Sequence, residues 1–208
     1  MEEKTKRNKT TCTYIGIMLL MVVASYFIYD HFMVERELKQ EEQLIEDYIK
    51  PETEVVNLSQ ETILNETKEK VKISYSMILE IPKINLKKGL CSIGQSCNNV
   101  SKNIEILKES DMPSVINGNL FLAGHNGNSK VSFFNKLDRL SVGDSIYIYY
   151  DGYKYEYKLD NYYDIKKTGE ANIKRDKNKT TLVLVTCKKN TKDKQVIYVA
   201  YLENKSEY

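Results

Sequence analysis

An uncharged stretch dominates the start of the chain, where residues 12–29 contain no Asp, Glu, Lys or Arg. At about 1.5 Å of rise per residue, a helix of this length just crosses a hydrocarbon layer of about 30 Å. Basic residues precede the stretch, and a basic flank favours the cytoplasmic side of a membrane. The pattern therefore predicts a transmembrane signal-anchor over residues 12–32, a cytoplasmic tail over residues 1–11, and a remainder that lies outside the cell.

Two other interpretations of this stretch stay open. Val22 and Ala24 satisfy the small-residue pattern of a cleavage site, so a cleaved signal peptide is one of them. The apolar run continues through residues 26–29 beyond that point, which favours an uncleaved anchor. A buried helix of a soluble protein is the third interpretation, and the one-sided basic flank disfavours it.

After the anchor, the sequence predicts a helix followed by a linker. Val34, Leu38 and Ile45 recur at helical spacing in a highly charged segment that ends near Pro51. The residues that follow are polar and rich in Glu, Thr, Lys and Asn, which is typical of a loosely attached arm. Residues 33–74 are therefore predicted to form a juxtamembrane helix and a linker.

From about Tyr75 the pattern changes to short strands separated by turns. Asp151 and Gly152 stand between two alternating segments and predict a tight hairpin. Residues 104–107 and 133–137 are predicted to form single helical turns. Many short strands with few helices indicate a mainly β fold, a closed or nearly closed antiparallel barrel over residues 75–208. The predicted strands are 77–81, 120–123, 145–150, 153–159, 181–186 and 196–202.

Charge and cysteine content narrow the classes of function. The 31 basic and 29 acidic residues leave a formal net charge of +2, which disfavours a nucleic-acid partner because such domains are usually strongly basic. Of the four cysteines, Cys12 lies at the edge of the apolar stretch. Cys91 and Cys97 lie in one Gly/Ser/Asn-rich loop and form either a small disulfide loop or two unrelated thiols. Cys187 is then the odd cysteine, as a reactive thiol is expected to be.

Two strand ends carry the residues that suggest chemistry. Cys187 ends an apolar run over 181–187, and His125 ends another over 121–125. His125 is the only histidine beyond residue 31. An imidazole near a thiol accepts its proton or stabilises the thiolate, and later protonates a leaving amine. Because 62 positions separate the two residues, a pair of unrelated core side chains is the competing interpretation.

Five short segments add to this pattern. They are Ile-Pro-Lys-Ile-Asn-Leu (81–86), Leu-Ala-Gly-His (122–125), Phe-Phe-Asn-Lys-Leu (133–137), Val-Gly-Asp-Ser-Ile-Tyr (142–147) and Thr-Leu-Val-Leu-Val-Thr-Cys (181–187). Together, and in this order, they resemble the sortases, the membrane-anchored cysteine transpeptidases of Gram-positive bacteria. The resemblance covers about residues 75–204. The short loop after His125, with no long lid segment before the barrel, favours a wall-anchoring sortase of class A or D over a pilus-polymerising one.

The resemblance implies an eight-stranded sortase barrel and a catalytic pair. Cys187 would attack the Thr–Gly bond of a C-terminal sorting signal of the Leu-Pro-x-Thr-Gly kind and form a thioacyl enzyme. His125 would act as general acid toward the departing glycine amine. An amine from a cell-wall precursor or a pilin lysine would then resolve the intermediate. The implied partners are surface proteins that carry such a signal, a cell-wall amine acceptor, and the membrane through the N-terminal helix.

One position departs from the family pattern. Sortases carry an arginine on the strand after the cysteine, where it helps to hold the substrate and the developing oxyanion. Alignment of the next apolar run places Gln195 at that position, and no arginine follows Arg175. A Gln amide donates a neutral hydrogen bond but lacks the charge and fork geometry of a guanidinium group. Lys192 and Lys194 in the same loop, or Arg139 and Arg175 elsewhere, are the other candidate donors.

The departure leaves several alternatives for the function. The sortase interpretation has three versions: an active enzyme that uses Gln195 or a nearby lysine, a slow one, and one that binds without turnover. A binding module is thus the main rival, although a decayed site has no reason to keep both Cys187 and His125. An unrelated anchored β domain with a structural Cys187 is the second rival, and it predicts a thiol that is inert to alkylation.

No cofactor and no required metal ion are predicted. Asp138, Asp144 and Asp164 do not form a metal-ligand spacing. Calcium activation, which some sortases show, has no signature in these residues. The sequence therefore predicts chemistry that depends on side chains alone.

Overall fold

A computed structural model describes residues 2–50 and 75–208, with side chains described at residue 14 and from residue 16 onward. The chain divides into two compact units, Met1–Gln43 and Leu44–Tyr208. The predicted linker over residues 51–74 lies outside the described residues.

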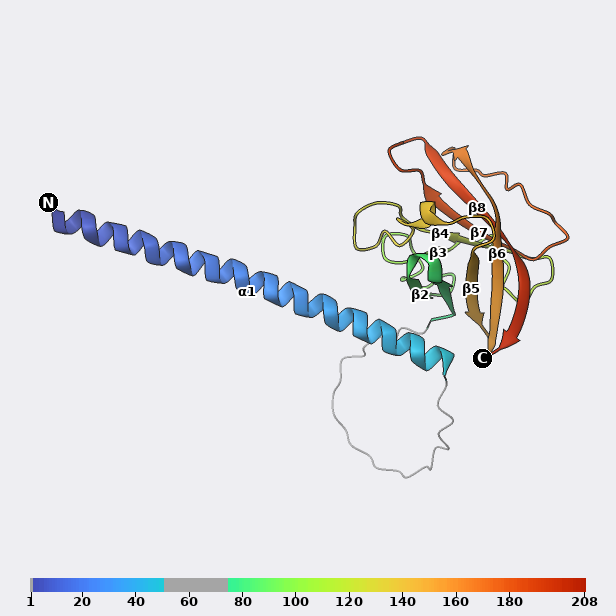
Figure 1. Cartoon of the computed structure of the whole chain (residues 1–208), viewed down its shortest axis with the longest axis horizontal. Coiled ribbons are helices and arrows are strands. Elements are labelled where there is room, and N and C mark those ends of the chain that lie inside the picture. The colour runs from blue at the N-terminus through green and yellow to red at the C-terminus, as the bar shows by residue number, and fades with distance from the viewer. Residues whose placement is uncertain (1, 51–74) are drawn as a thin grey trace, which may run out of the picture. The chain divides into compact units, whose positions relative to one another are not determined.

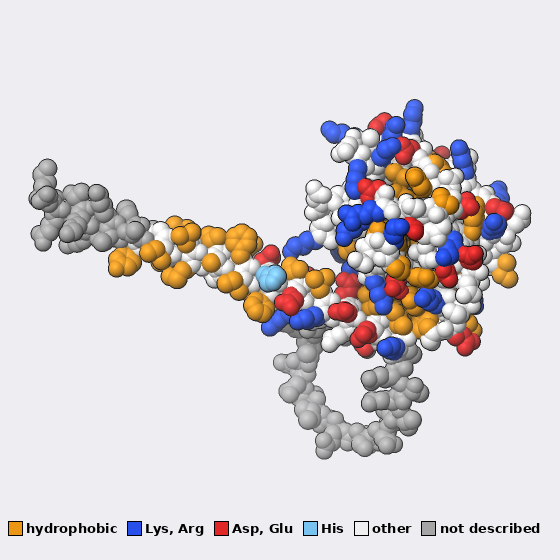
Figure 2. All heavy atoms as spheres, viewed as in Figure 1, with side chains coloured by type: hydrophobic (Ala, Val, Ile, Leu, Met, Phe, Trp, Pro, Cys, Tyr) orange, Lys and Arg blue, Asp and Glu red, His pale blue; other side chains and the backbone are white. Residues whose placement is uncertain are grey.

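The N-terminal segment is one helix, α1 (Glu2–Ile49), so no break separates the predicted anchor from the predicted juxtamembrane helix. Large apolar side chains from Tyr14 to Met33 are exposed along it, as Figure 2 shows. Within the described residues, Gly16–Ile49 is the one helical span that is long and apolar enough to cross a membrane. Length and composition are therefore compatible with a membrane anchor, as the sequence predicts.

The C-terminal unit is built on a single eight-stranded sheet that curls into a nearly closed barrel (Figure 1). The strand order is β2-β1-β5-β6-β8-β7-β4-β3, which confirms the predicted mainly β fold. The strands are β1 (Met77–Ile81), β2 (Leu86–Leu90), β3 (Glu105–Ile106), β4 (Asn119–Ala123), β5 (Ser145–Tyr150), β6 (Tyr153–Lys166), β7 (Thr181–Cys187) and β8 (Lys194–Glu207). Two short 3₁₀ helices, η1 (Pro82–Ile84) and η2 (Leu137–Arg139), complete the described elements.

One pair of neighbouring strands runs parallel. β4 pairs with β7 in parallel, whereas the other neighbours are antiparallel, so the expectation of a purely antiparallel barrel is wrong for this pair. The alternation of apolar and polar residues does not reveal strand direction, because both kinds of pairing have a side-chain period of two. The parallel pair is the feature that positions the site.

Side-chain alternation divides the barrel wall into two faces. Leu182, Leu184 and Tyr198 belong to the large core cluster inside the barrel. The alternate positions Val183 and Ile197 form a second cluster on the other face. β7 and β8 are therefore covered on both faces, as expected for the continuous apolar run of β7.

The predicted hairpin is present. Asp151 and Gly152 have positive φ values of 51° and 76°, as a tight two-residue turn of type I′ requires. Tyr150 and Tyr153 are paired across the turn, and Tyr157 and Ile148 on its inner face are fully buried. β6 and β8 extend well beyond their predicted ends because they pair with each other along most of their length.

Two predicted helical turns differ from the structure. Residues 104–107 contain strand β3 rather than a helical turn, because Glu105 and Ile106 pair with β4 and Asn98 hydrogen-bonds both the N–H and the C=O of Ile106. Residues 133–137 form a turn that continues into η2, so the helical part lies later than predicted. Segments this short carry too few residues for periodicity to separate helix from strand.

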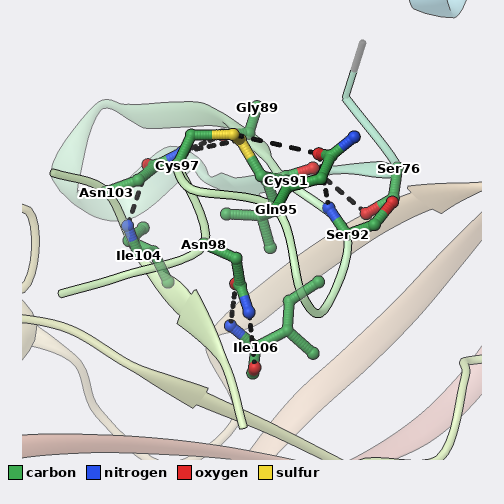
Figure 3. Close-up of a disulfide and its surroundings, with 11 residues drawn as sticks. Ser76, Gly89, Cys91, Ser92, Gln95, Cys97, Asn98, Asn103, Ile104 and Ile106 are labelled. Carbon is green, nitrogen blue, oxygen red and sulfur yellow. Dashed lines mark hydrogen bonds between the residues drawn. A yellow bond between two sulfur atoms is a disulfide. The ribbon is translucent and has the colours of Figure 1, made fainter. Parts of the chain in front are cut away.

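A disulfide joins Cys91 and Cys97, with 5.9 Å between their Cα atoms (Figure 3). It closes a loop directly after β2. Within that region Asn103 Nδ2 donates to the carbonyl of Gly89 in β2 at 2.8 Å, and Asn103 Oδ1 accepts from the N–H of Ile104 at 2.8 Å. The disulfide loop thus connects β2 to the segment that enters β3, at the two ends of the strand order.

Loss of this disulfide should destabilise the barrel unit. Closure of so short a loop removes unfolded-state entropy worth about 2 kcal/mol, so Cys97→Ser should lower the free energy of unfolding by about that amount. Urea unfolding of the full chain, followed by tyrosine fluorescence, measures the change. Cys187→Ser is the matched control because it removes a thiol without opening a loop; equal losses in both variants would contradict the prediction.

Candidate active site

The parallel pairing brings the two predicted catalytic residues to the same edge of the sheet. Cys187 is the last residue of β7, and His125 lies two residues past the end of β4. Ala123 is paired with Val185 in this parallel register. Because parallel neighbours end at the same edge, the segments that carry the thiol and the imidazole lie side by side in the fold although they are far apart in sequence.

Strand alternation places Cys187 on the outer face of the barrel wall. Val183 and Val185 belong to the outer cluster, and Cys187 continues their two-residue period. Cys187 is a free cysteine and is half-buried, while Ala123 and Val185 beside it are also only partly covered. The thiol therefore borders a partly exposed apolar surface.

The segment that carries His125 is held in place by its backbone. The N–H of Gly124 donates to the carbonyl of Val185 at 3.1 Å, and Thr186 Oγ1 donates to the carbonyl of Gly124 at 2.7 Å. The carbonyl of His125 accepts from the N–H of Phe134 at 3.0 Å. The backbone is thus fixed on both sides of His125, while its imidazole is exposed.

Gln195 lies directly opposite Cys187. The two residues are paired across β7 and β8, and the N–H of Lys188 donates to the carbonyl of Lys194 at 3.0 Å. That bond makes Cys187 and Gln195 a non-hydrogen-bonded pair, the kind in which the side chains lie closest, with Cβ atoms about 4.5–5.5 Å apart. The register therefore places the side chain of Gln195 on the same face of the sheet as the Cys187 thiol.

The other candidate donors are held elsewhere or face away. Arg175 donates to the carbonyls of Asn117 and Lys179 and to Thr181 Oγ1, at 3.3, 3.4 and 3.3 Å. Since Thr181 begins β7 and Cys187 ends it, Arg175 is roughly 20 Å from the thiol. Lys194 neighbours Gln195 on β8, so its side chain takes the opposite face.

Two lysines after Cys187 are paired with carboxylates. Lys188 Nζ contacts Asp164 Oδ2 of β6, and Lys189 Nζ lies 2.7 Å from Asp138 Oδ2 of η2. Arg139 and Lys192 are exposed. Among the described residues, Gln195 is thus the polar donor that the sheet register itself places beside the thiol.

An apolar surface continues from the thiol across the outer face. Ile165 of β6 is paired with Gln195 and belongs with Val185 to the outer cluster, and Ile173 of the β6–β7 connection packs on the same cluster. The hydroxyl of Tyr163 holds that connection in place by accepting a hydrogen bond from the N–H of Lys174 at 2.7 Å. This surface suits an extended peptide with apolar side chains better than a charged ligand.

A separate pocket of about 300 Å³ lies behind the strand end, on the inner face. Val196 and Tyr198 line it, and both belong with the barrel core rather than with the outer cluster. Burial raises the pKa of Tyr198 to about 12, with smaller contributions from Asp138, Tyr162 and Asp164. The pocket is thus separated by the β7–β8 wall from the face on which Cys187 lies.

Comparisons with known proteins agree with this geometry. The family model described as the sortase domain matches residues 79–203. The chain belongs to the sortase family. It is 28% identical over 211 residues to sortase A of Bacillus anthracis, covering 92% of this chain and 94% of that protein.

Solved sortase structures have the same fold. Sortase A of Listeria monocytogenes matches with a TM-score of 0.53 and 21% identity, over 64% of this chain and 90% of that one. A Clostridium perfringens sortase D5 transpeptidase matches with a TM-score of 0.53 and 25% identity, over 63% and 80% of the respective chains. The family identifies this sortase as a cysteine transpeptidase of the sorting-signal type.

Sequence reasoning named Cys187, His125 and Gln195 as site residues, and the sheet register brings their segments to one edge. It missed one interaction of this sortase. Asn126 Nδ2 donates to the carbonyl of Cys187 at 2.9 Å. The position of Asn126 directly after His125 is the single sequence feature that points to this interaction. The catalytic roles of Cys187, His125 and Gln195 stay predictions.

The absence of a metal requirement also stays a prediction. The described residues contain no cluster of three or more His, Cys, Asp or Glu suited to a metal ion.

Gly124 should be intolerant of a side chain. A Cβ at this position would lie 2.7 Å from Cδ2 of the fully buried Phe134 ring. Gly124→Ala should therefore lower the free energy of unfolding by about 1–3 kcal/mol. It should also reduce activity, because Phe134 holds the backbone of His125.

Urea unfolding and peptide turnover of the full chain measure both effects. Gly127→Ala is the matched control, since its Cβ would meet only the Ser132 hydroxyl, at the longer distance of 3.3 Å. A Gly124→Ala protein as stable and active as Gly127→Ala would show that the close approach to Phe134 is not a constraint.

Proposed function

We propose that this sortase cleaves the Thr–Gly bond of a Leu-Pro-x-Thr-Gly-like sorting signal and joins the new carboxyl end to a cell-wall amine. The observation that carries the proposal is the arrangement of Cys187 and His125 on adjacent parallel strand ends, beside an accessible apolar surface. An extended signal peptide suits that surface because its apolar side chains replace water on the outer cluster.

The first half-reaction forms the thioacyl enzyme. The Cys187 thiolate attacks the carbonyl carbon of the signal threonine, and the carbonyl oxygen takes the negative charge of the tetrahedral intermediate. The C–N bond to glycine then breaks, and protonated His125 gives its proton to the departing amine. The exposure of the imidazole supports this role, since the leaving segment must depart past it.

The second half-reaction transfers the acyl group. An incoming primary amine attacks the thioester carbon, neutral His125 accepts the amine proton, and the Cys187 thiolate leaves. The enzyme returns to its starting protonation state, and one peptide bond has replaced another. The amine acceptor is proposed to be a cell-wall precursor, and the signal-bearing partner a surface protein.

Gln195 is proposed to donate to the developing oxyanion. Its pairing with Cys187 supports this role, because the side chains of such a pair lie close together and a Gln amide carries two donor hydrogens. Removal of one oxyanion donor typically costs about 100- to 1000-fold in rate. A neutral amide stabilises the oxyanion less than a guanidinium group would, because charge-assisted hydrogen bonds are roughly twice as strong as neutral ones.

The N-terminal helix is proposed to anchor the enzyme with its N-terminus in the cytoplasm and the barrel outside. Lys4, Lys6 and Arg7 precede the apolar stretch, and such basic flanks stay on the cytoplasmic side. The disulfide between Cys91 and Cys97 supports an outside location for the barrel, because disulfides persist in oxidising compartments.

A second candidate function is a sortase-like module that binds sorting signals and turns over slowly or not at all. The neutral Gln195 at the arginine position is the observation that favours it. Under this alternative the groove binds the peptide, but the oxyanion lacks enough stabilisation for acylation.

A covalent adduct test separates the two candidates. The full chain in detergent is mixed with Leu-Pro-x-Thr-Gly peptides, and intact mass spectrometry should show a thioacyl adduct on Cys187 that an added amine releases. Cys187→Ala should abolish the adduct, and His125→Ala should slow its formation by about 100- to 10,000-fold. Peptide binding by calorimetry without any adduct would support the binding module instead.

Restoration of the arginine tests the role of Gln195. Gln195→Arg should raise the rate of adduct formation by about 10-fold or more, whereas Gln195→Ala should lower it, because the donor beside Cys187 changes in strength. Single-turnover kinetics measure both rates. Gln195→Lys supplies charge without the fork, and Gln95→Arg is a remote control. Equal rates in all four variants would exclude Gln195 as an oxyanion donor.

A further inference from the structure

One polar atom of the Asn126 side chain has a hydrogen-bond partner and the other has none among the described residues. Its Nδ2 donates to the carbonyl of Cys187 at 2.9 Å, whereas its Oδ1 is buried and has no hydrogen-bond partner among the described residues. A buried acceptor without a partner is costly, and such groups in native proteins usually have a functional reason. The hydrogen bond from Nδ2 to the Cys187 carbonyl is the candidate for that functional reason.

The hydrogen bond from the Asn126 side chain continues the parallel ladder between β4 and β7 beyond the last backbone hydrogen bond. The N–H of Gly124 donates to the carbonyl of Val185, and the next carbonyl in the parallel pattern, two residues further, is that of Cys187. The Asn126 side chain bonds that carbonyl in place of a backbone N–H. The end of β7 is thereby tied to the residue that follows His125.

Asn126 lies at the inner pocket and not on the outer apolar surface that is proposed to bind the peptide. It lines the inner pocket together with Val196 and Tyr198, whereas Cys187 continues the outer face of β7. A peptide bound on the outer face therefore does not need to contact Asn126. Loss of the side chain is expected to disturb the reacting geometry without weakening peptide binding.

We propose that Asn126 is a positioning residue that holds the nucleophile-bearing end of β7 in register with the His125 segment. The inference rests on the proposed transpeptidation, in which Cys187 and His125 act on the same scissile bond. A misplacement of about 1 Å at a reacting group costs on the order of 100-fold in rate. A single hydrogen bond at the strand end is thus able to carry a large part of the activity.

The test compares Asn126→Ala and Asn126→Asp with the matched controls Asn128→Ala and Asn128→Asp in the same loop. The Asp variant keeps the shape of the side chain and loses the donor, so it remains informative if the Ala variant fails to fold. Steady-state turnover of the full chain with a sorting-signal peptide should show kcat lowered by about 10- to 100-fold. KM should stay within about twofold of the wild-type value, and both Asn128 controls should match wild type.

Hydrogen–deuterium exchange supplies a readout that does not need turnover. Exchange in residues 124–128 and 185–190 should become faster in both Asn126 variants and stay unchanged in the Asn128 controls. Unchanged kcat and exchange, or a raised KM with unchanged kcat, would overturn the positioning role. If wild type turns over no peptide, the proposed function fails, and the exchange data alone decide whether Asn126 holds the strand end.

Discussion

The site depends on the parallel pairing of β4 with β7, because only that pairing brings Cys187 and His125 to one edge of the sheet. Its register, with Ala123 opposite Val185, also decides which face of β7 the thiol takes. A slip of one residue would turn Cys187 toward the barrel interior. The register is stabilised by burial of Leu122 and Leu184, both fully inaccessible, since a buried leucine contributes about 1.5–3 kcal/mol.

Beyond the end of β4 the backbone turns away from β7, and side chains take over the connection. The carbonyl of His125 bonds Phe134, so this part of the chain follows the next turn rather than the ladder. Thr186 and Asn126 bridge the two segments instead, one hydrogen bond from each strand end. The arrangement holds the backbone on both sides of the histidine and leaves its imidazole exposed, which suits the proton transfers proposed for His125.

The electrostatic character of the site follows from where the cations are held. Lys188 and Lys189 pair with Asp164 and Asp138, and Arg175 binds backbone carbonyls at the far end of β7. The position opposite the thiol is left to a neutral amide, Gln195. The barrel therefore has the fold of its family, and the oxyanion donor proposed for it is a neutral amide.

Much of this protein was determined by local sequence. The apolar run that forms part of α1, the hairpin at Asp151 and Gly152, and the choice of Cys187 and His125 as candidates follow from residue type and spacing. Gln195 was reached only through the resemblance to the sortases. Strand direction, the disulfide, strand β3 and the bond from Asn126 to Cys187 do not follow from residue type and spacing. The disulfide depends on the conformation of one short loop. The other three depend on contacts between separate segments, whereas periodicity reports only which face of its own segment a residue occupies. Tertiary structure alone decided that two strand ends separated by 62 positions meet at one edge, because only packing of the whole barrel fixes which strands are neighbours.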